Sequence, residues 1–395
     1  MKRIVMFEGG VETLGWFSHQ MAERFREAGY LVFFYNLEDE DTSAKKLRKF
    51  IKTGETALVT FNFQGLEKEA GVYSEREGYV WDAYRIPCYN IAADHPYFYH
   101  DRLRELPKAY YHVSIDRFHQ KYFREFYPEF SEAGFLPLAG TELADAADGR
   151  KLQTASRPID VVFTGNYTEL PFFEPYINWI NDEYAEFYRG IIQELIQKPA
   201  ETVEAVALRH CEREMGKVAC DQLRGAFYRM IFIDLYVRNY WRGLAVRLLA
   251  DAGIRVDVVG KGWEDLDCEH PENLILHPQT DSVTCLRLLR QSKISLNVMP
   301  WFKDGAHDRV FNSILNGAVC VSDTSAYLGG ELADGEGVCY FDLGKIQELP
   351  VIVQELLQDR EKMESISAKG MPKVRAYHTW AQRADTLAEW IERGR

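Results

Sequence analysis

Short apolar runs alternate with longer amphipathic stretches along most of this chain, and glycine follows many of the runs. The first such unit predicts a strand at Ile4–Phe7, a helix at Leu14–Ala28 and a second strand at Leu31–Tyr35, with Gly29 ending the helix. Continuous apolar runs indicate strands buried on both faces, and a helix between two such strands connects them in parallel. The pattern therefore predicts an α/β fold built on parallel sheets.

The alternation continues and then stops in a polar segment. Further strands are predicted at Ala57–Phe61, Pro87–Ala92, Tyr110–Ser114 and Phe135–Leu138, and helices at Ala44–Lys52, Glu75–Tyr84, Tyr99–Arg104 and Ile115–Phe126. The segment Gly140–Pro158 loses apolar periodicity and gains Ala, Asp, Gly and Ser, which is the composition of a connector. We therefore expect a first domain over residues 1–140 and a linker over residues 141–158.

A second set of strands begins directly after this connector. A long helical tract, interrupted near Gly216 and ending about Gly253, follows the first of them and is interpreted as a helical insertion. The second domain is expected over residues 159–375, and residues 376–395 are expected to form a terminal helix for which packing back on the first domain is one arrangement. The predicted elements are strands at Ile159–Phe163, Arg255–Val259, Asn273–Leu276, Ile294–Val298, Ala318–Val321 and Val338–Phe341, and helices at Asp281–Arg290, Asp308–Leu315 and Trp380–Arg393.

Length and charge limit the class of protein. A chain of 395 residues exceeds the size at which one core stops growing, so two domains with a cleft between them are expected. Its 60 acidic side chains outnumber 47 Lys and Arg, and a net charge of −13 argues against nucleic acid or an anionic membrane as the main partner. No signal peptide and no stretch of about 18 uncharged apolar residues is present. We expect a soluble, cytoplasmic protein without stable membrane insertion.

Metal and disulfide sites are not expected. The seven cysteines form no Cys-x-x-Cys pair, and several lie in apolar runs, which is typical of buried thiols in a reducing compartment. The triplet Asp265-Leu266-Asp267 has the form that some enzymes use to hold Mg²⁺ or Mn²⁺ on a diphosphate. Such triplets arise easily in a chain this acidic, so we interpret it as a surface feature.

Two cations at the start of one predicted helix are the clearest sign of chemistry. In the block Ser292–Asp342, a buried strand precedes a polar loop and a helix that opens with His307 and Arg309. The helix dipole disfavours cations in the first turn, so their presence indicates an anion, and a guanidinium beside free helix N–H groups suits a diphosphate. Alternatively, Arg309 pairs with Asp308 or Asp304 on a solvated helix end.

Three loops follow other strands of the second domain. Gly165 and Asn166 come directly after one strand, and Lys261 lies between two glycines after another, where the backbone can approach a ligand closely. Ser325 belongs to a loop of hydroxyl-bearing residues after a third strand. We expect these residues to line an anion site, although a plain surface lysine and a simple turn explain the same patterns.

The first domain offers a candidate general base. Asp94 and His95 follow a predicted strand and are fixed by Pro96, so a carboxylate and an imidazole lie at the strand's carboxyl end. Alternatively, the aspartate only caps the turn. The loop Gly9–Gly15 lacks the spacing Gly-x-Gly-x-x-Gly, so a dinucleotide cofactor is not expected.

The segment Lys303–Val319, KDGAHDRVFNSILNGAV, resembles the CgeB-like (spore-maturation-protein-B-like) glycosyltransferases, a branch of the GT-B type with two Rossmann-like domains. The specific resemblance covers about Lys293–Glu331, and a wider one, through the strand and glycine turns, covers Ile159–Asp342. The large retaining branch of that superfamily carries Glu-x7-Glu on this helix. Here Asp304 and Asn312 occupy the two positions, which weakens any transfer of the retaining mechanism.

The resemblance implies the GT-B architecture, two Rossmann-like domains facing across a cleft, with the helical insertion in the second. It implies a metal-independent glycosyltransferase of the hexosyltransferase type that moves a sugar from a nucleotide-sugar donor, by resemblance UDP-linked, to a protein, polysaccharide or small-molecule acceptor, with no further cofactor. Alternatives are a sugar-nucleotide epimerase and a non-catalytic binding protein. The expected roles are diphosphate binding by Lys261, His307 and Arg309, ribose binding by Asn312 and activation of the acceptor by Asp94 or His95.

Overall fold

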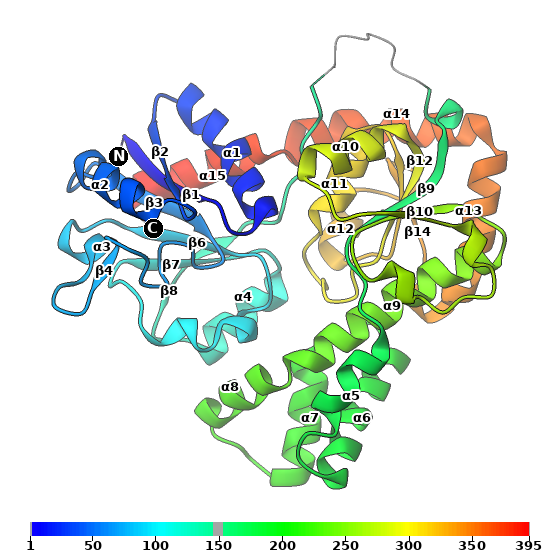
Figure 1. The fold of residues 1–395 in the computed structure, drawn as a ribbon, viewed down its shortest axis with the longest axis horizontal. Helices are drawn as coiled ribbons and strands as arrows, with labels where there is room; N and C mark the ends of the chain where they lie inside the picture. The colour runs from blue at the N-terminus through cyan, green and yellow to red at the C-terminus, as the bar shows by residue number, and fades with distance from the viewer. Residues whose placement is uncertain (1, 145–152, 395) are drawn as a thin grey trace. The chain divides into compact units, whose positions relative to one another are not determined.

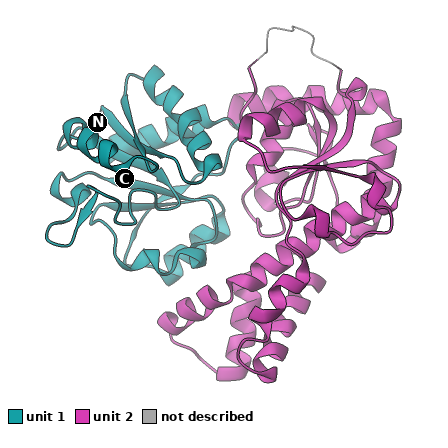
Figure 2. Ribbon diagram, viewed as in Figure 1, with its two compact units in different colours: residues 1–139, 378–395 teal, residues 140–377 magenta. Residues whose placement is uncertain are grey.

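A computed structural model of the chain describes residues 2–144 and 153–394. It divides into two compact units, Met1–Ala139 with His378–Arg395 and Gly140–Tyr377, which Figure 2 shows in teal and magenta. Each unit contains a six-stranded sheet with parallel pairing, and helices flank both sheets (Figure 1). The α/β fold predicted from the apolar pattern is confirmed. Residues 145–152 of the predicted connector lie outside the described residues.

Unit 1 is a doubly wound sheet that includes the C-terminal helix. Its elements are β1 (Arg3–Glu8), α1 (Glu12–Glu27), β2 (Leu31–Asn36), α2 (Glu40–Phe50), β3 (Thr56–Phe61), β4 (Tyr73–Ser74), β5 (Gly78–Tyr79), α3 (Val80–Ala83), β6 (Cys88–Ala92), η1 (Pro96–Tyr99), η2 (Arg102–Arg104), β7 (Tyr110–Ser114), α4 (Arg117–Phe126), β8 (Ser131–Phe135) and α15 (Trp380–Arg393). The strand order is β2-β1-β3-β6-β7-β8. Strand β3 is buried along its whole length, as its continuous apolar run predicts.

The terminal helix α15 packs on α1. Phe17 of α1 lies 4.4 Å from the ring of Trp380, measured between ring centroids. Nε of Arg24 donates to Asp385 at 2.8 Å, and the hydroxyl of Tyr30 donates to Glu392 at 2.9 Å. One apolar and one polar contact therefore hold α15 to α1, and Tyr30, which follows α1, adds a second polar contact.

Unit 2 has the strand order β11-β10-β9-β12-β13-β14. Its sheet and the covering elements are η3 (Thr154–Ser156), β9 (Ile159–Thr164), β10 (Val256–Val259), η5 (Trp263–Asp265), η6 (Pro271–Asn273), β11 (Leu274–His277), α10 (Ser282–Gln291), β12 (Ser292–Asn297), α11 (Asp308–Leu315), β13 (Val319–Ser322), α12 (Ala326–Glu331), β14 (Val338–Tyr340), η7 (Leu343–Glu348), α13 (Leu349–Gln358) and α14 (Arg360–Tyr377). The chain runs outward in one direction through β9, β10 and β11 and in the other through β12, β13 and β14. The order therefore reverses between β9 and β12, and in doubly wound sheets ligands bind at the carboxyl ends of such strands.

The predicted insertion is a helical arm between β9 and β10. It consists of η4 (Leu170–Phe173), α5 (Glu174–Ile177), α6 (Asp182–Gln197), α7 (Val203–Met215), α8 (Cys220–Arg229) and α9 (Ile231–Asp251), drawn in green in Figure 1. Helix α9 contacts other helices of the arm and also contacts β10 and α13 of the sheet layer. Gly216 ends α7 with φ +70°, which explains the interruption seen in the sequence.

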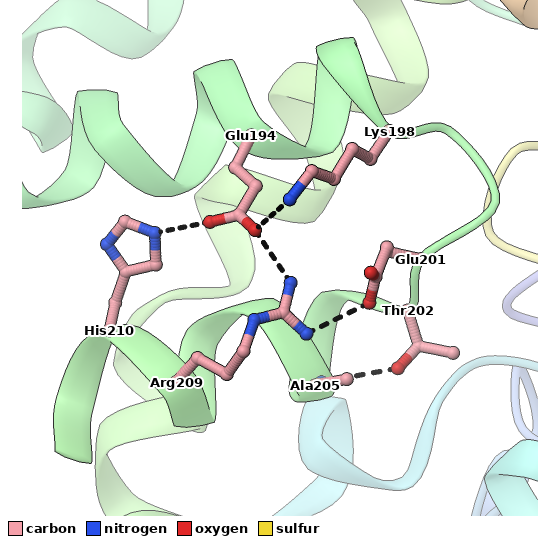
Figure 3. Close-up of polar contacts among 7 residues, drawn as sticks. All are labelled: Glu194, Lys198, Glu201, Thr202, Ala205, Arg209 and His210. Atoms are coloured by element: carbon pink, nitrogen blue, oxygen red, sulfur yellow. Dashed lines mark hydrogen bonds and ion pairs between the residues drawn. The ribbon is translucent and has the colours of Figure 1, made fainter. Parts of the chain in front are cut away.

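Charged side chains fasten α6 to α7 within the arm (Figure 3). The carboxylate of Glu194 accepts hydrogen bonds from Lys198 at 3.0 Å, Arg209 at 2.7 Å and His210 at 2.8 Å. Arg209 also donates to Glu201 at 2.9 Å. Hydrogen bonding to Arg209, followed by Lys198 and His210, lowers the pKa of Glu194 to about 2. These contacts therefore join α6 and α7 into a helical hairpin.

Three predicted elements of unit 1 are wrong. Phe135–Leu138 is not a strand beyond its first residue, because the side chain of Arg383 bonds the carbonyls of Pro137 and Leu138 at 2.7 and 3.1 Å. The predicted helix Glu75–Tyr84 is instead the short antiparallel pair β4 and β5 followed by the four-residue α3. Gly78, with φ +71°, turns the chain there. The predicted helix Tyr99–Arg104 is replaced by the 3₁₀ turns η1 and η2.

Candidate functional site

Arg309 joins the two strands between which the second sheet reverses its order. Its Nη1 donates to the backbone oxygen of Thr164, the last residue of β9, at 2.7 Å. Its Nε donates to the side-chain oxygen of Asn297, the last residue of β12, at 3.1 Å. The sequence predicts a cation at this sheet edge, and the guanidinium lies at the carboxyl ends of both strands.

The guanidinium is buried. Arg309 is only 6% exposed, its Cζ lies 5.1 Å above the ring of Phe163, and burial lowers its pKa to about 10. The alternative of an ion pair on a solvated helix end does not fit this burial. Among the described residues, its Nη2 has no hydrogen-bond partner. A buried guanidinium with one unused donor is suited to an anionic oxygen.

His307 is the N-cap of α11 and is electrically neutral near pH 7. Its Nδ1 lies 2.6 Å from Asp308 and 3.3 Å from the backbone nitrogen of Arg309. In the second contact Nδ1 accepts from the backbone N–H of Arg309, which makes His307 the cap of the helix. Burial, with Arg309 next, lowers the pKa of His307 to about 4. A neutral imidazole adds no positive charge, and the predicted contact of His307 with a diphosphate stays a prediction.

Asn312 and Ser325 bind other parts of the protein. The side chain of Asn312 accepts from the backbone N–H of Thr141 at 2.8 Å and donates to Asp308 at 2.9 Å. Ser325 donates to the carbonyl of Gly305 at 2.5 Å and caps α12 by accepting from Leu328 at 3.0 Å. Both side chains are therefore held by contacts within the protein, and their predicted roles in donor binding stay predictions.

The loops after β9 and β10 touch through glycines. A Cβ on Gly260 would lie 2.6 Å from the carbonyl oxygen of Gly165, and a Cβ on Gly165 would lie 2.7 Å from Nη1 of Arg309. Both glycines also have φ near +150°. Asn166 completes the junction by accepting from the backbone N–H of Lys261 at 3.0 Å. Four of the predicted site positions, Gly165, Asn166, Lys261 and Arg309, are therefore brought together.

Sequence analysis missed an arginine at this edge. Arg242 of α9 donates through Nη1 to the backbone oxygen of Asn166 at 2.9 Å. Its Cζ lies 5.2 Å from the ring centroid of Trp301, and that ring lies 5.8 Å from the ring of His307. Arg242 lies 76 residues from Asn166 in a helix that the sequence shows only as part of an insertion. No local signal connects it with the site.

A second missed residue is the buried Asp323 after β13. Its carboxylate accepts from the backbone N–H of Met299 at 2.8 Å, which ties the loop after β12 to the loop after β13. Burial raises its pKa to about 7. The protonation state of this carboxyl group, which joins the two loops at the sheet edge, therefore changes near neutral pH.

The candidate bases Asp94 and His95 differ in environment. Asp94 is partly exposed and accepts from the hydroxyl of Tyr99 at 3.4 Å. His95 is 4% exposed, accepts from the backbone N–H of Tyr97 at 3.3 Å, and its ring lies 4.5 Å from that of His119. The buried ring suits packing, so within unit 1 Asp94 is the better placed of the two to meet a substrate.

The structure also bears on metals and membranes. No group of three or more His, Cys, Asp or Glu side chains arranged to hold a metal ion occurs within residues 2–144 and 153–394. None of the seven cysteines, all of which lie in the described residues, forms a disulfide. In the same described ranges, no helix is long and apolar enough to cross a membrane.

One family model matches the C-terminal part of the chain. Residues 242–389 match the model of a family described as glycosyl transferase-like, and this match begins at Arg242. No curated protein matches the chain.

Several solved structures resemble the whole chain at low sequence identity. Sucrose-phosphate synthase from Thermosynechococcus elongatus has a TM-score of 0.52 and 10% identity, covering 100% of this chain and 99% of its own. HepE from Anabaena in complex with UDP and glucose has a TM-score of 0.51 and 11% identity, covering 100% of both chains. An α-glucosyltransferase in complex with UDP-glucose and DNA containing an abasic site has a TM-score of 0.54 and 11% identity, covering 100% of this chain and 99% of its own.

The class follows from the fold. The chain has the GT-B architecture of two Rossmann-like sheets, with a helical arm in the second unit. Its C-terminal part matches the model of a family described as glycosyl transferase-like, and two of the similar structures contain UDP or UDP-glucose.

Proposed function

We propose that this protein is a glycosyltransferase that uses a UDP-linked sugar, with a hexose as the first candidate. The observation that carries the proposal is the convergence of Arg309 and Arg242 at the carboxyl ends of the strands between which the second sheet reverses. Exposed Lys261 belongs to the same loop junction. Three cations at one sheet edge suit a diphosphate, whose charge increases at the leaving group during transfer.

The proposal assigns charge neutralisation to side chains. Arg309, Arg242 and Lys261 supply up to three positive charges, which supports turnover without a divalent metal. We further propose membership of the CgeB-like branch, supported by the segment Lys303–Val319. A cytoplasmic location belongs to the same proposal, and the seven free cysteines support a reducing compartment.

Asp94 is proposed as the base if the reaction inverts configuration. Its partial exposure and its place after β6 support this choice, since a base must reach the hydroxyl whose proton it takes. If the reaction retains configuration, no such base is needed and Asp94 binds the acceptor only. Asp94→Asn should then reduce transfer far less than in the inverting case.

A donor panel tests the function. UDP at a hundredfold excess over its Kd should stabilise the protein by about 2.7 kcal/mol, and at least one UDP-sugar should be hydrolysed slowly to UDP and free sugar. Both effects should persist in EDTA. Loss of hydrolysis in EDTA would contradict the side-chain assignment.

The remaining outcomes separate the alternatives. Conversion of one UDP-sugar into another without release of UDP would identify an epimerase. Stabilisation without turnover on any donor or acceptor would indicate a binding protein. The absence of stabilisation by every nucleotide tested would overturn the proposal.

A further inference from the structure

The helical arm exposes an unusual number of aromatic side chains. Twelve large apolar residues are exposed in the described parts of the chain, and five of them lie within residues 172–184. Surface apolar residues are usually scattered, and their concentration marks an interaction site. We call these five residues the aromatic face: Phe172 at 53% exposed, Tyr176 at 47%, Trp179 at 79%, Ile180 at 51% and Tyr184 at 46%.

Ring contacts connect three of the five residues of this face, Phe172, Tyr176 and Tyr184. Trp179 and Ile180 lie between Tyr176 and Tyr184 in the sequence. The ring of Phe172 lies 5.9 Å from Tyr176, which lies 6.1 Å from Phe232 of α9. Phe232 contacts Tyr188 at 5.1 Å, and Tyr188 lies 6.1 Å from Tyr184. The rings therefore come from η4, α5, α6 and α9 and support one another, which makes the surface rigid.

The aromatic face is continuous with the donor edge. The segment that follows β9 contacts α9 at successively earlier positions of that helix. Asn166 accepts from Arg242, and the N–H of Thr168 donates to Asn239 at 2.9 Å. Further along, Phe173 packs on Tyr236 at 5.8 Å, and Tyr176 packs on Phe232. Phe232 and Arg242 are ten residues apart on one helix, a rise of about 15 Å.

The charge around the face selects among partners. Between residues 169 and 189 the chain carries five carboxylates and one arginine, and that arginine, Arg189, pairs with Glu174 at 2.6 Å. An acidic rim repels anionic lipids, nucleic acid and the same face of a second copy. A neutral glycan fits, because the C–H faces of sugar rings pack on aromatic rings while sugar hydroxyls donate to carboxylates.

We propose that the aromatic face binds a neutral glycan chain, which is the acceptor. This inference rests on the proposed function and narrows its acceptor to a polymer. A single sugar does not span about 15 Å, whereas a chain of a few sugar units does. Such a chain can lie on the face while its reacting end lies at the donor edge of the same unit.

The test uses the whole protein and soluble neutral polysaccharides. Native electrophoresis in gels containing dextran, glucomannan or galactan should retard the wild type in at least one of them. Trp179→Ala should lose at least half of that retardation, and Tyr176→Ala together with it should lose nearly all. Met215→Ala is the matched control, because Met215 is 60% exposed on α7 of the same arm and has no part in the aromatic face.

Stabilisation by UDP is measured on every variant and should be unchanged, since Trp179 does not touch the donor edge. Normal UDP binding with no retardation in any gel, or with equal retardation of Trp179→Ala, overturns the glycan proposal and leaves the proposed function standing. A wild-type protein that does not bind UDP would contradict the proposed function instead. A different outcome is that the wild type co-sediments with neutral phosphatidylcholine vesicles, that Trp179→Ala does not, and that no polysaccharide retards the wild type. This outcome assigns the face to a membrane and also overturns the proposal.

Discussion

The Nη1 atom of Arg309 lies 2.7 Å from the backbone oxygen of Thr164, 145 residues earlier in the chain. The same side chain bonds Asn297, so one guanidinium links the ends of β9 and β12. These are the strands between which the order of the second sheet reverses. If Arg309 also binds the donor, as proposed, stability and donor binding are coupled at this single residue.

Replacement of Arg309 by Ala should affect both properties. Thr164 and Asn297 lose a donor in a buried region, which should lower the free energy of unfolding by about 1–3 kcal/mol. Loss of a charge-assisted contact should also weaken UDP binding at least tenfold, or about 1.4 kcal/mol. Urea unfolding and calorimetric titration with UDP measure the two effects.

Arg309→Lys is the matched control for this experiment. Lysine keeps the charge but cannot form the two hydrogen bonds in the same planar geometry. Compared with Arg309→Ala, it should therefore recover part of the UDP affinity and a smaller part of the free energy of unfolding. A less stable Arg309→Ala protein that binds UDP as tightly as the wild type would show that Arg309 is a structural link only.

Lys261 provides the complementary prediction. Its side chain is exposed and only its backbone is bonded, to Asn166. Lys261→Ala should therefore leave the free energy of unfolding unchanged and weaken UDP binding by about threefold or more, with a reduced dependence on salt. Lys217→Ala, an exposed lysine of the arm, is the control. Equal UDP affinity of the two variants would place Lys261 outside the site.

The sequence predicted those parts of the site that depend on local patterns. Helix α11 spans the predicted residues, and the glycine turns after β9 and β10 meet because parallel strands bring their carboxyl ends to one edge. A buried strand run and a glycine stop are encoded within a few residues of each other, so periodicity reveals them. The structure accordingly brings Gly165, Asn166, Lys261 and Arg309 together at one sheet edge, where the sequence places them.

The remaining parts depend on contacts between distant segments. Arg242 reaches Asn166 only because α9 packs at the sheet edge, and the amide of Asn312 is bonded by Thr141, 171 residues away. Burial also changes chemistry without changing sequence, as at His307, where it lowers the pKa. Phe135–Leu138 has the apolar pattern of a strand, but Arg383 takes up its carbonyls. None of these contacts leaves a local signal.

Glu194 should determine the stability of the arm in acid. Hydrogen bonds from Arg209, Lys198 and His210 lower its pKa from 4.5 to about 2, so the folded arm binds a proton less tightly than the unfolded chain. The contribution is present above 4.5 and is lost as the pH falls toward 2. Glu194→Gln should speed amide hydrogen exchange in α6 and α7 at pH 7, whereas Glu186→Gln, exposed on the same helix, should not. Identical exchange in both variants would show that the ion pairs of Figure 3 do not hold the hairpin together.

Asp323 should make the protein less stable as the pH rises. Burial raises its pKa from 3.8 to about 7, so the folded state binds the proton more tightly than the unfolded state. Its contribution is complete below 3.8 and is lost as the pH rises through about 7. Asp323→Asn removes this loss and keeps an oxygen that can accept from the N–H of Met299. The variant should therefore become more stable than the wild type.

The difference in unfolding free energy between Asp323→Asn and the wild type should widen from pH 4 to pH 7 and then remain constant. Its final size should be on the order of a few kcal/mol, because each pKa unit corresponds to about 1.4 kcal/mol. Urea unfolding at a series of pH values measures it, and Asp221→Asn is the control because its side chain is 90% exposed. A difference that does not change between pH 4 and pH 8 would mean that the carboxyl group of Asp323 is not buried in solution, and that the loops after β12 and β13 are not joined through it.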